Sequence, residues 1–264
     1  MKIFTYYIND YYHNQASQLK LIEAWQRNWS NAGFEAVVLG ENDAKKYKFY
    51  EKVIEGCEFN NEAVIGKKLN RYDLACYQRW MAYAALDLDD FFYVSDYDVC
   101  NNIFDGTPPK TNSLVFLQGF CPSFVYGNSK LFADFCELFG SKYSKDKVTH
   151  ARKIYSDEEN RWIFRKHNDQ DFILLNMSFR WAYGGKEAAK EIFNKYNLAI
   201  YPRFFPGTHE NIVGEQIFDP VALYPKVSHF SSRFLYEYSK SHKRELTRTD
   251  LFDISRRLVS GIIK

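Results

Sequence analysis

The sequence lacks several features that would place it in a familiar class. No stretch approaches the roughly 20 consecutive apolar residues that a membrane-spanning helix needs. The N-terminal residues do not show the charged segment, apolar segment and cleavage site of a signal peptide. The five cysteines include no C-x-x-C pair, and H-E-x-x-H is absent, so zinc is not indicated. We therefore expect reduced thiols and a cytoplasmic location.

An excess of charge of one sign is also missing. Lysine and arginine total 35 against 33 acidic residues, which gives a net charge of +2. Nucleic acid is therefore not indicated as the main partner. Aromatic residues, in contrast, make up 18% of the chain. They suit a large core, and they also suit stacking on a sugar or a nucleobase.

Apolar patterning predicts an α/β protein. A strand over residues 2–8, a helix with apolar residues from Leu19 to Trp29, and a strand over residues 34–39 form a typical parallel βαβ start. Gly33 is the expected end of that helix. The other predicted strands cover 91–94, 114–117 and 124–126, and the other predicted helices cover 71–86 and 128–139. Residues 42–66 are expected to be connecting structure and residues 141–161 to be polar and exposed.

The helix predicted over residues 71–86 has a clear start. Asn70 can cap it, with Asp73 three residues later, and an apolar stripe runs from Leu74 to Ala84. Arg79 lies off that stripe, so its side chain is available for something other than the core.

Asp96-Tyr97-Asp98 follows the apolar run 91–94. Apolar residues at successive positions suit a strand that is covered on both faces, as in a parallel sheet. In open α/β sheets, ligands bind beyond the carboxyl ends of the strands, and carboxylates there suit a divalent cation that clamps a phosphate. The alternative is a polar turn in which the aspartates cap local N–H groups.

Two later segments belong with this triplet. Asn168-Asp169-Gln170-Asp171 precedes an apolar run, and Lys226-Val227-Ser228-His229-Phe230 lies near the C-terminus. In this order, with the arginine-bearing helix, they resemble the retaining GT-A glycosyltransferases, the family of glycogenin and bacterial lipooligosaccharide galactosyltransferases. The resemblance is scattered over residues 2–232. It implies a single GT-A domain over residues 1–238, with a mostly parallel central sheet flanked by helices.

The resemblance also implies a metal site. Asp96 and Asp98 would bind Mn²⁺ (or Mg²⁺), with His229 as a further ligand. An imidazole favours manganese over magnesium or calcium. The metal would bridge the diphosphate of a nucleotide-sugar, with a UDP-hexose as the expected donor and a glycan or glycoconjugate as the acceptor.

Other roles follow from the same resemblance. Arg79 would face the donor diphosphate and sugar, although a surface ion pair with Asp73 or Asp87 is the alternative. The segment of catalytic candidates, Asp169, Gln170 and Asp171, would line the donor sugar. Carboxylates and amide oxygens there would stabilise an oxocarbenium-like transition state.

The remaining donor-binding candidates are Tyr7, Asn9, Tyr97 and Arg233. Tyr7 and Asn9 match the place where the family holds the base and ribose. The family has a glycine and a lysine after its late histidine, where this chain has Ser231, Ser232 and Arg233. Only Arg233 could replace the lysine that contacts the diphosphate. The family's N-A-G segment is missing.

The segment 239–264 is predicted to be a basic amphipathic helix. Its apolar face is formed by Leu251, Ile254, Leu258 and Ile262. One reading is a helix docked on the domain, and the other is peripheral attachment to an anionic membrane surface.

Two other functions remain open. A phosphatase or phosphotransferase of the haloacid-dehalogenase type also carries D-x-D, but it wants Thr or Val where this chain has Cys100, and it places the motif near the N-terminus. A non-catalytic glycan-binding protein would use the aromatic residues but would not need all three motifs together.

Overall fold

The computed structural model describes residues 1–9, 15–109, 112–117 and 123–156. From the rest of the chain it describes residues 195, 247, 249 and 250 and four short strands, in which only Val227 has a described side chain. The site predictions at Asp169, Gln170, Asp171 and Arg233 lie outside the described residues.

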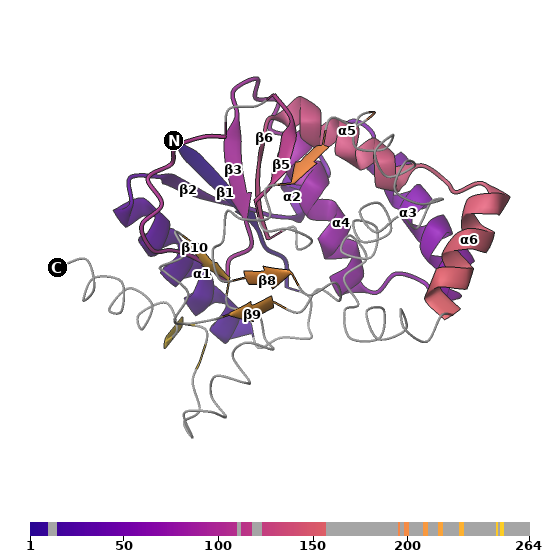
Figure 1. Cartoon of the computed structure of the whole chain (residues 1–264), viewed down its shortest axis with the longest axis horizontal. Coiled ribbons are helices and arrows are strands. Elements are labelled where there is room, and N and C mark those ends of the chain that lie inside the picture. The colour runs from indigo at the N-terminus through magenta and orange to yellow at the C-terminus, as the bar shows by residue number, and fades with distance from the viewer. Residues whose placement is uncertain are drawn as a thin grey trace.

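The chain folds around a six-stranded mixed sheet in the order β2-β1-β3-β6-β5-β7 (Figure 1). β1 pairs in parallel with both β2 and β3, and β5 pairs in parallel with β7. β6 runs antiparallel to β3 and β5, which the sequence analysis did not predict. The α/β prediction is confirmed. The strands are β1 (Lys2–Tyr6), β2 (Glu35–Leu39), β3 (Phe92–Ser95), β5 (Leu114–Phe116), β6 (Phe124–Gly127) and β7 (Leu198–Ile200).

Four short strands form two smaller sheets. β4 (Val99–Asn101) pairs antiparallel with β10 (Val227–His229), and β8 (Thr208–Glu210) pairs antiparallel with β9 (Gln216–Phe218). β4 begins directly after the Asp96-Tyr97-Asp98 triplet, so the first of these sheets adjoins the predicted metal site.

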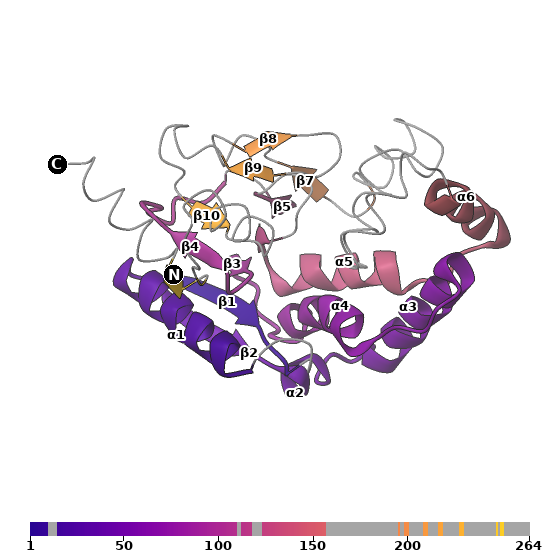
Figure 2. The same cartoon turned by 90° about the horizontal axis from the view of Figure 1, so that it is seen from below.

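Helices cover both faces of the main sheet. α1 (Gln15–Asn31) packs on one face, and α4 (Arg71–Ala84) and α5 (Ser129–Gly140) pack on the other. α3 (Tyr50–Ile65) and α6 (Lys145–Ser156) lie beyond α4 and α5 (Figure 2). Among the described residues, no helix is long and apolar enough to cross a membrane.

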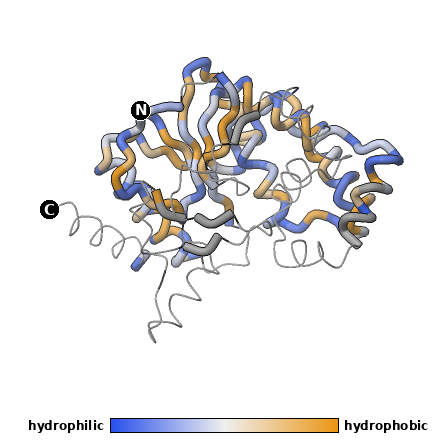
Figure 3. Tube along the Cα trace, viewed as in Figure 1, coloured by the Kyte–Doolittle hydropathy of each residue, from blue (hydrophilic) through white to orange (hydrophobic). Residues whose placement is uncertain are grey.

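Successive strand residues point to opposite faces, and both faces are buried. Ile3 and Tyr93 join the cluster that packs on α1, whereas Phe4 and Phe92 join the cluster that packs on α4 and α5. Hydrophobic stretches accordingly lie along the strands of the sheet and in the helices beside it (Figure 3). The prediction of a strand covered on both faces is confirmed for β3.

The helix ends follow the predicted signals. Asn70 accepts a hydrogen bond from the Asp73 N–H at 2.8 Å, and its own N–H donates to the Asp73 carboxylate at 3.5 Å, so the predicted cap of α4 is confirmed. Gly33 follows α1 with φ +86°, and the Phe34 N–H donates back to the Trp29 carbonyl at 3.1 Å. Glycine adopts that φ without the cost other residues meet, which explains why the helix stops there.

The expectation of connecting structure over residues 42–66 is wrong. This segment contains most of α2 (Glu41–Ala44) and all of α3. The reason is that α3 buries Asn60, Asn61 and Gly56 together with Val53 and Cys57, so its inner face has no continuous apolar stripe. In the segment 141–161, the described side chains are mostly exposed, and residues 145–156 form α6, with Ala151 buried.

Of the helix predicted over residues 239–264, only residues 247, 249 and 250 are described. Thr247 accepts a hydrogen bond from the Asp250 N–H at 3.2 Å, and the Thr247 N–H donates to the Asp250 carboxylate at 2.7 Å. This reciprocal pair is a helix N-cap arrangement. The remaining residues of the segment 239–264 lie outside the described part of the chain.

Candidate functional site

The sheet has a topological switch point between β1 and β3. The chain leaves β1 toward β2 on one side and returns in β3 on the other side, with all three strands parallel. The segments that follow β1 and β3, residues 7–9 and 96–98, therefore leave the same edge of the sheet side by side. Ligands of open α/β sheets bind in the crevice at such a point.

Asp96-Tyr97-Asp98 forms a tight turn that takes the chain from β3 into β4. The Asp96 carbonyl accepts from the Val99 N–H at 3.1 Å, and the Asp96 N–H donates to the Ser123 carbonyl at 2.8 Å. The Asp98 residue is 7% exposed, whereas the Asp96 side chain is 30% exposed. One carboxylate thus lies inside the turn and the other partly faces solvent.

Arg79 reaches this turn from α4. Its Nη1 lies 2.6 Å from Asp96 Oδ1, and its side chain is only 13% exposed. This ion pair joins Arg79 to Asp96 and is largely buried, in contrast to the surface pair with Asp73 or Asp87 that was the alternative. The guanidinium offsets part of the negative charge that two neighbouring aspartates place at the end of β3.

Tyr7 and Tyr97 connect the two segments at the switch point. Their ring centroids are 6.0 Å apart at an interplanar angle of 84°, an edge-to-face contact. The Tyr7 N–H donates to the Leu39 carbonyl at 2.9 Å, which extends the pairing of β1 with β2 by one residue. The aromatic residues that sequence analysis assigned to donor binding thus touch one another.

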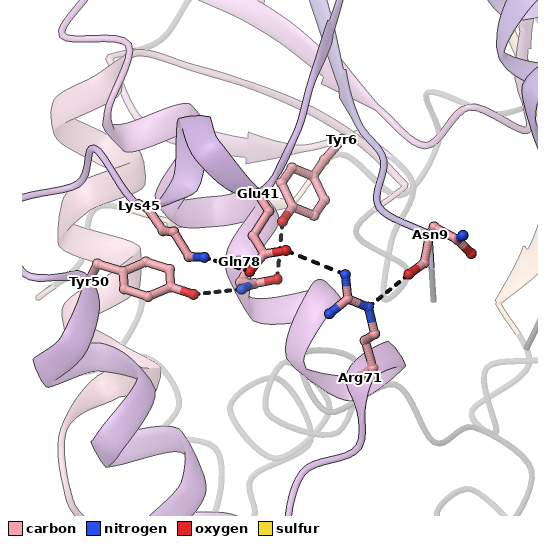
Figure 4. A network of polar contacts seen from close by, with 7 residues as sticks. All are labelled: Tyr6, Asn9, Glu41, Lys45, Tyr50, Arg71 and Gln78. Atoms are coloured by element: carbon pink, nitrogen blue, oxygen red, sulfur yellow. Dashed lines mark hydrogen bonds and ion pairs between the residues drawn. The ribbon is translucent and has the colours of Figure 1, made fainter. Parts of the chain in front are cut away.

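Arg71, at the first turn of α4, holds the other side of the site (Figure 4). Its Nε donates to the Asn9 carbonyl at 2.7 Å, and its Nη2 lies 3.4 Å from Glu41 Oε2. Lys45 Nζ lies 2.8 Å from Glu41 Oε1, and this hydrogen bond is the main cause of a lowered pKa for Glu41. The segment after β1 is thus tied to α2 and to α4.

A neutral network lies behind this ionic one. The Tyr6 hydroxyl donates to Gln78 Oε1 at 3.1 Å, and Gln78 Nε2 donates to the Tyr50 hydroxyl at 2.6 Å (Figure 4). Burial raises the pKa of Tyr6 far above its usual range, so the hydroxyl keeps its proton and remains a donor. The sequence assigned no role to these three residues, because their hydrogen bonds join positions 72 and 28 residues apart in the chain.

α1 fixes the turn from the opposite face of the sheet. Trp25 Nε1 donates to Ser95 Oγ at 2.9 Å, and Trp29 Nε1 donates to the Val99 carbonyl at 3.1 Å. Asn28 bonds the main chain of Asn101. Sequence analysis used the two tryptophans only as apolar spacing and missed Asn28, although a polar residue between Trp25 and Trp29 on a buried helix face was the available signal.

The pairing of β4 with β10 brings the late histidine segment to the same place. The backbone of His229 lies opposite Val99, the residue after Asp98. Among the side chains that are described, which do not include that of His229, no three His, Cys, Asp or Glu residues gather as a metal-binding group. The third-ligand role of His229 remains a prediction.

The described residues place two carboxylates, a guanidinium and two aromatic rings at one sheet edge. Carboxylate oxygens suit a hard divalent cation, a guanidinium suits a phosphate, and aromatic rings suit a base or a sugar. Comparisons with protein-family models, with curated proteins and with solved structures find no match to this chain. The function is therefore inferred from the chemistry of the residues at this sheet edge.

Proposed function

We propose that this protein is a metal-dependent glycosyltransferase of the GT-A type. It would transfer a hexosyl group from a nucleotide-sugar, with UDP-hexose as the expected donor, to a glycan or glycoconjugate, with retention at the anomeric carbon. The observation that carries the proposal is the Asp96-Tyr97-Asp98 turn at the switch point, with Arg79 bonded to Asp96.

Asp96, Asp98 and His229 are the residues that would hold Mn²⁺ or Mg²⁺. The donor set fits, because two carboxylates leave the end of β3 and the backbone of His229 lies opposite Val99. When bound, the cation neutralises the charge that develops on the leaving diphosphate. Asp98, which is 7% exposed, would hold a fixed ligand position, whereas Asp96 would divide its interactions between the cation and Arg79.

Arg79 is proposed to bind the diphosphate. A guanidinium pairs well with phosphate oxygens, and α4 holds this one at the turn with little solvent around it. When an anionic donor arrives, the guanidinium can exchange part of its contact with Asp96 for the phosphate. Arg233 is proposed as a second diphosphate contact.

The base and ribose are assigned to the segment after β1. Tyr7, Asn9 and Tyr97 line the switch point, and Arg71 fixes the main chain of Asn9. Asp169, Gln170 and Asp171 are proposed to line the donor sugar, where their oxygens would stabilise positive charge on the anomeric carbon.

The test is nucleotide-sugar hydrolysis and transfer with UDP-, GDP- and CMP-sugars, with and without Mn²⁺. Asp98→Asn keeps the shape of the side chain but removes its charge, so we expect turnover to fall by about 10²–10³-fold. Asp90→Asn is the control, because Asp90 is an exposed carboxylate before the opposite end of β3. Its rate should equal that of the wild type.

Two results would reject the proposal. One is an Asp98→Asn protein with the wild-type rate. The other is metal-dependent release of phosphate from simple phosphate esters with no turnover of any nucleotide-sugar, which would favour the phosphatase alternative.

A further inference from the structure

Asn28 of α1 is buried beside the turn, and none of the proposed roles uses it. The residue is 6% exposed. Its Nδ2 donates to the Asn101 carbonyl at 2.9 Å, and its Oδ1 accepts from the Asn101 N–H at 2.6 Å. A carboxamide carries both a donor and an acceptor, so it satisfies both main-chain groups of Asn101 as a neighbouring strand would.

Trp29 contacts the same edge of β4. Its indole N–H donates to the Val99 carbonyl at 3.1 Å. Main-chain groups of residues two apart point to the same edge of a strand, so Val99 and Asn101 present one edge to α1. The opposite edge is left for β10, and Figure 2 shows β4 between α1 and β10.

β4 consequently links α1 to both predicted sources of metal ligands. Asp98 immediately precedes β4, and His229 pairs with Val99 while Val227 pairs with Asn101. β4 is only three residues long. A shift of Asn101 would therefore displace the turn at one end of the strand and the partner strand beside it.

We propose that Asn28 is a positioning residue for the metal site. By bonding Asn101, it fixes β4 and thereby sets the distance between Asp98 and His229. The proposal rests on the proposed function, because it assumes that a cation binds at the turn. Groups that orient metal ligands from behind commonly change metal affinity by about 10- to 100-fold when they are removed.

Asn60 supplies a matched control. It lies on α3 and is also 6% exposed. Its Nδ2 donates to the Ser141 carbonyl at 2.9 Å, and its Oδ1 accepts from the Tyr143 N–H at 2.8 Å. Asn28→Ala and Asn60→Ala each remove a buried carboxamide that donates to one main-chain carbonyl and accepts from one main-chain N–H. The two variants should therefore lose similar thermal stability.

The measurement is Mn²⁺ binding by electron paramagnetic resonance, in the presence of UDP or GDP, on full-length protein that near-ultraviolet circular dichroism shows to be folded. We expect Asn28→Ala to weaken Mn²⁺ binding by about 10- to 100-fold, and Asn60→Ala to leave it unchanged. Trp29→Phe keeps an aromatic ring in the core but removes the indole donor. It should weaken binding in the same direction by less, and it serves as the test if Asn28→Ala does not fold.

The outcomes separate the two proposals. If the wild type binds Mn²⁺ and the α1 variants bind it as tightly as Asn60→Ala does, the positioning role is overturned and the proposed function stands. If the wild type binds no Mn²⁺ with either nucleotide, the proposed function is overturned and the positioning role falls with it.

Discussion

α1 and α4 flank the switch point, but they contact its segments with different chemistry. α1 uses neutral donors, the indoles of Trp25 and Trp29 and the amide of Asn28, and it bonds a hydroxyl and main-chain atoms. α4 uses the guanidiniums of Arg71 and Arg79, which bond Asn9, Glu41 and Asp96. Neutral groups hold the strand ends without changing their charge, whereas the guanidiniums set the local potential. We therefore expect α1 to determine the position of the strand ends and α4 to determine the binding of an anion.

Arg79→Ala should have the largest effect of the changes on these two helices. Removing the guanidinium takes away the proposed diphosphate contact, so kcat/KM for the nucleotide-sugar should fall by about 100-fold. Arg27→Ala is the control, because Arg27 lies on α1 with a 65% exposed side chain and pairs only loosely with Glu23, at 3.8 Å. The measurement is steady-state kinetics, which gives kcat/KM for the nucleotide-sugar in each of the two variants. Equal rates for both variants would show that Arg79 does not bind the donor diphosphate.

Trp25→Phe should have a smaller effect, and mainly on stability. The variant leaves the Ser95 hydroxyl, in a residue that is 2% exposed, without its indole donor, at a cost of about 1–2 kcal/mol in the free energy of unfolding. Urea unfolding of Trp25→Phe, Ser95→Ala and the double variant measures the coupling. If the two single costs add fully, the hydrogen bond contributes nothing to stability.

Tyr6→Phe should have the smallest effect and should leave turnover unchanged. The lost bond to Gln78 should cost about 1 kcal/mol. Burial raises the pKa of Tyr6 and, by the same cause, that of Tyr93. These two phenols lose their protons near pH 10 in the unfolded chain but keep them in the folded chain. The free energy of unfolding should therefore fall as the pH rises above about 10.

Unfolding measurements across alkaline pH check this sign. In the Tyr6→Phe variant, the free energy of unfolding should decrease less with rising pH, because one phenol no longer ionises in the unfolded state. A Tyr6→Phe protein with the full wild-type pH dependence would show that Tyr6 titrates equally in both states.

Sequence patterns predicted the elements in which packing and local signals agree. The apolar run before Asp96 is β3, and the cap at Asn70 starts α4, because both signals act within a few residues. α3 was not predicted, since it packs through a backbone contact in place of an apolar stripe. A Cβ added at Gly56 would lie 1.7 Å from the Gly140 carbonyl oxygen. A close approach of this kind depends on two helices and leaves no local pattern.

The grouping of the candidate residues at one sheet edge was predictable to the same degree. The aspartates and Arg79 could be found because their residue types carry the chemistry. The contact of Asn28 with Asn101 could not, because it joins residues far apart in the chain through main-chain atoms that every residue has. Such positioning contacts become visible only when the strands have been placed.

We propose above all that the turn at the switch point binds a divalent cation. Crystals grown with Mn²⁺ and UDP, examined by anomalous scattering at the manganese edge, test it directly. We expect a peak about 2.0–2.3 Å from carboxylate oxygens of Asp96 and Asp98 and from an imidazole nitrogen of His229. A map with no peak at this turn, or with manganese bound elsewhere while Asp98 remains without it, would contradict the account.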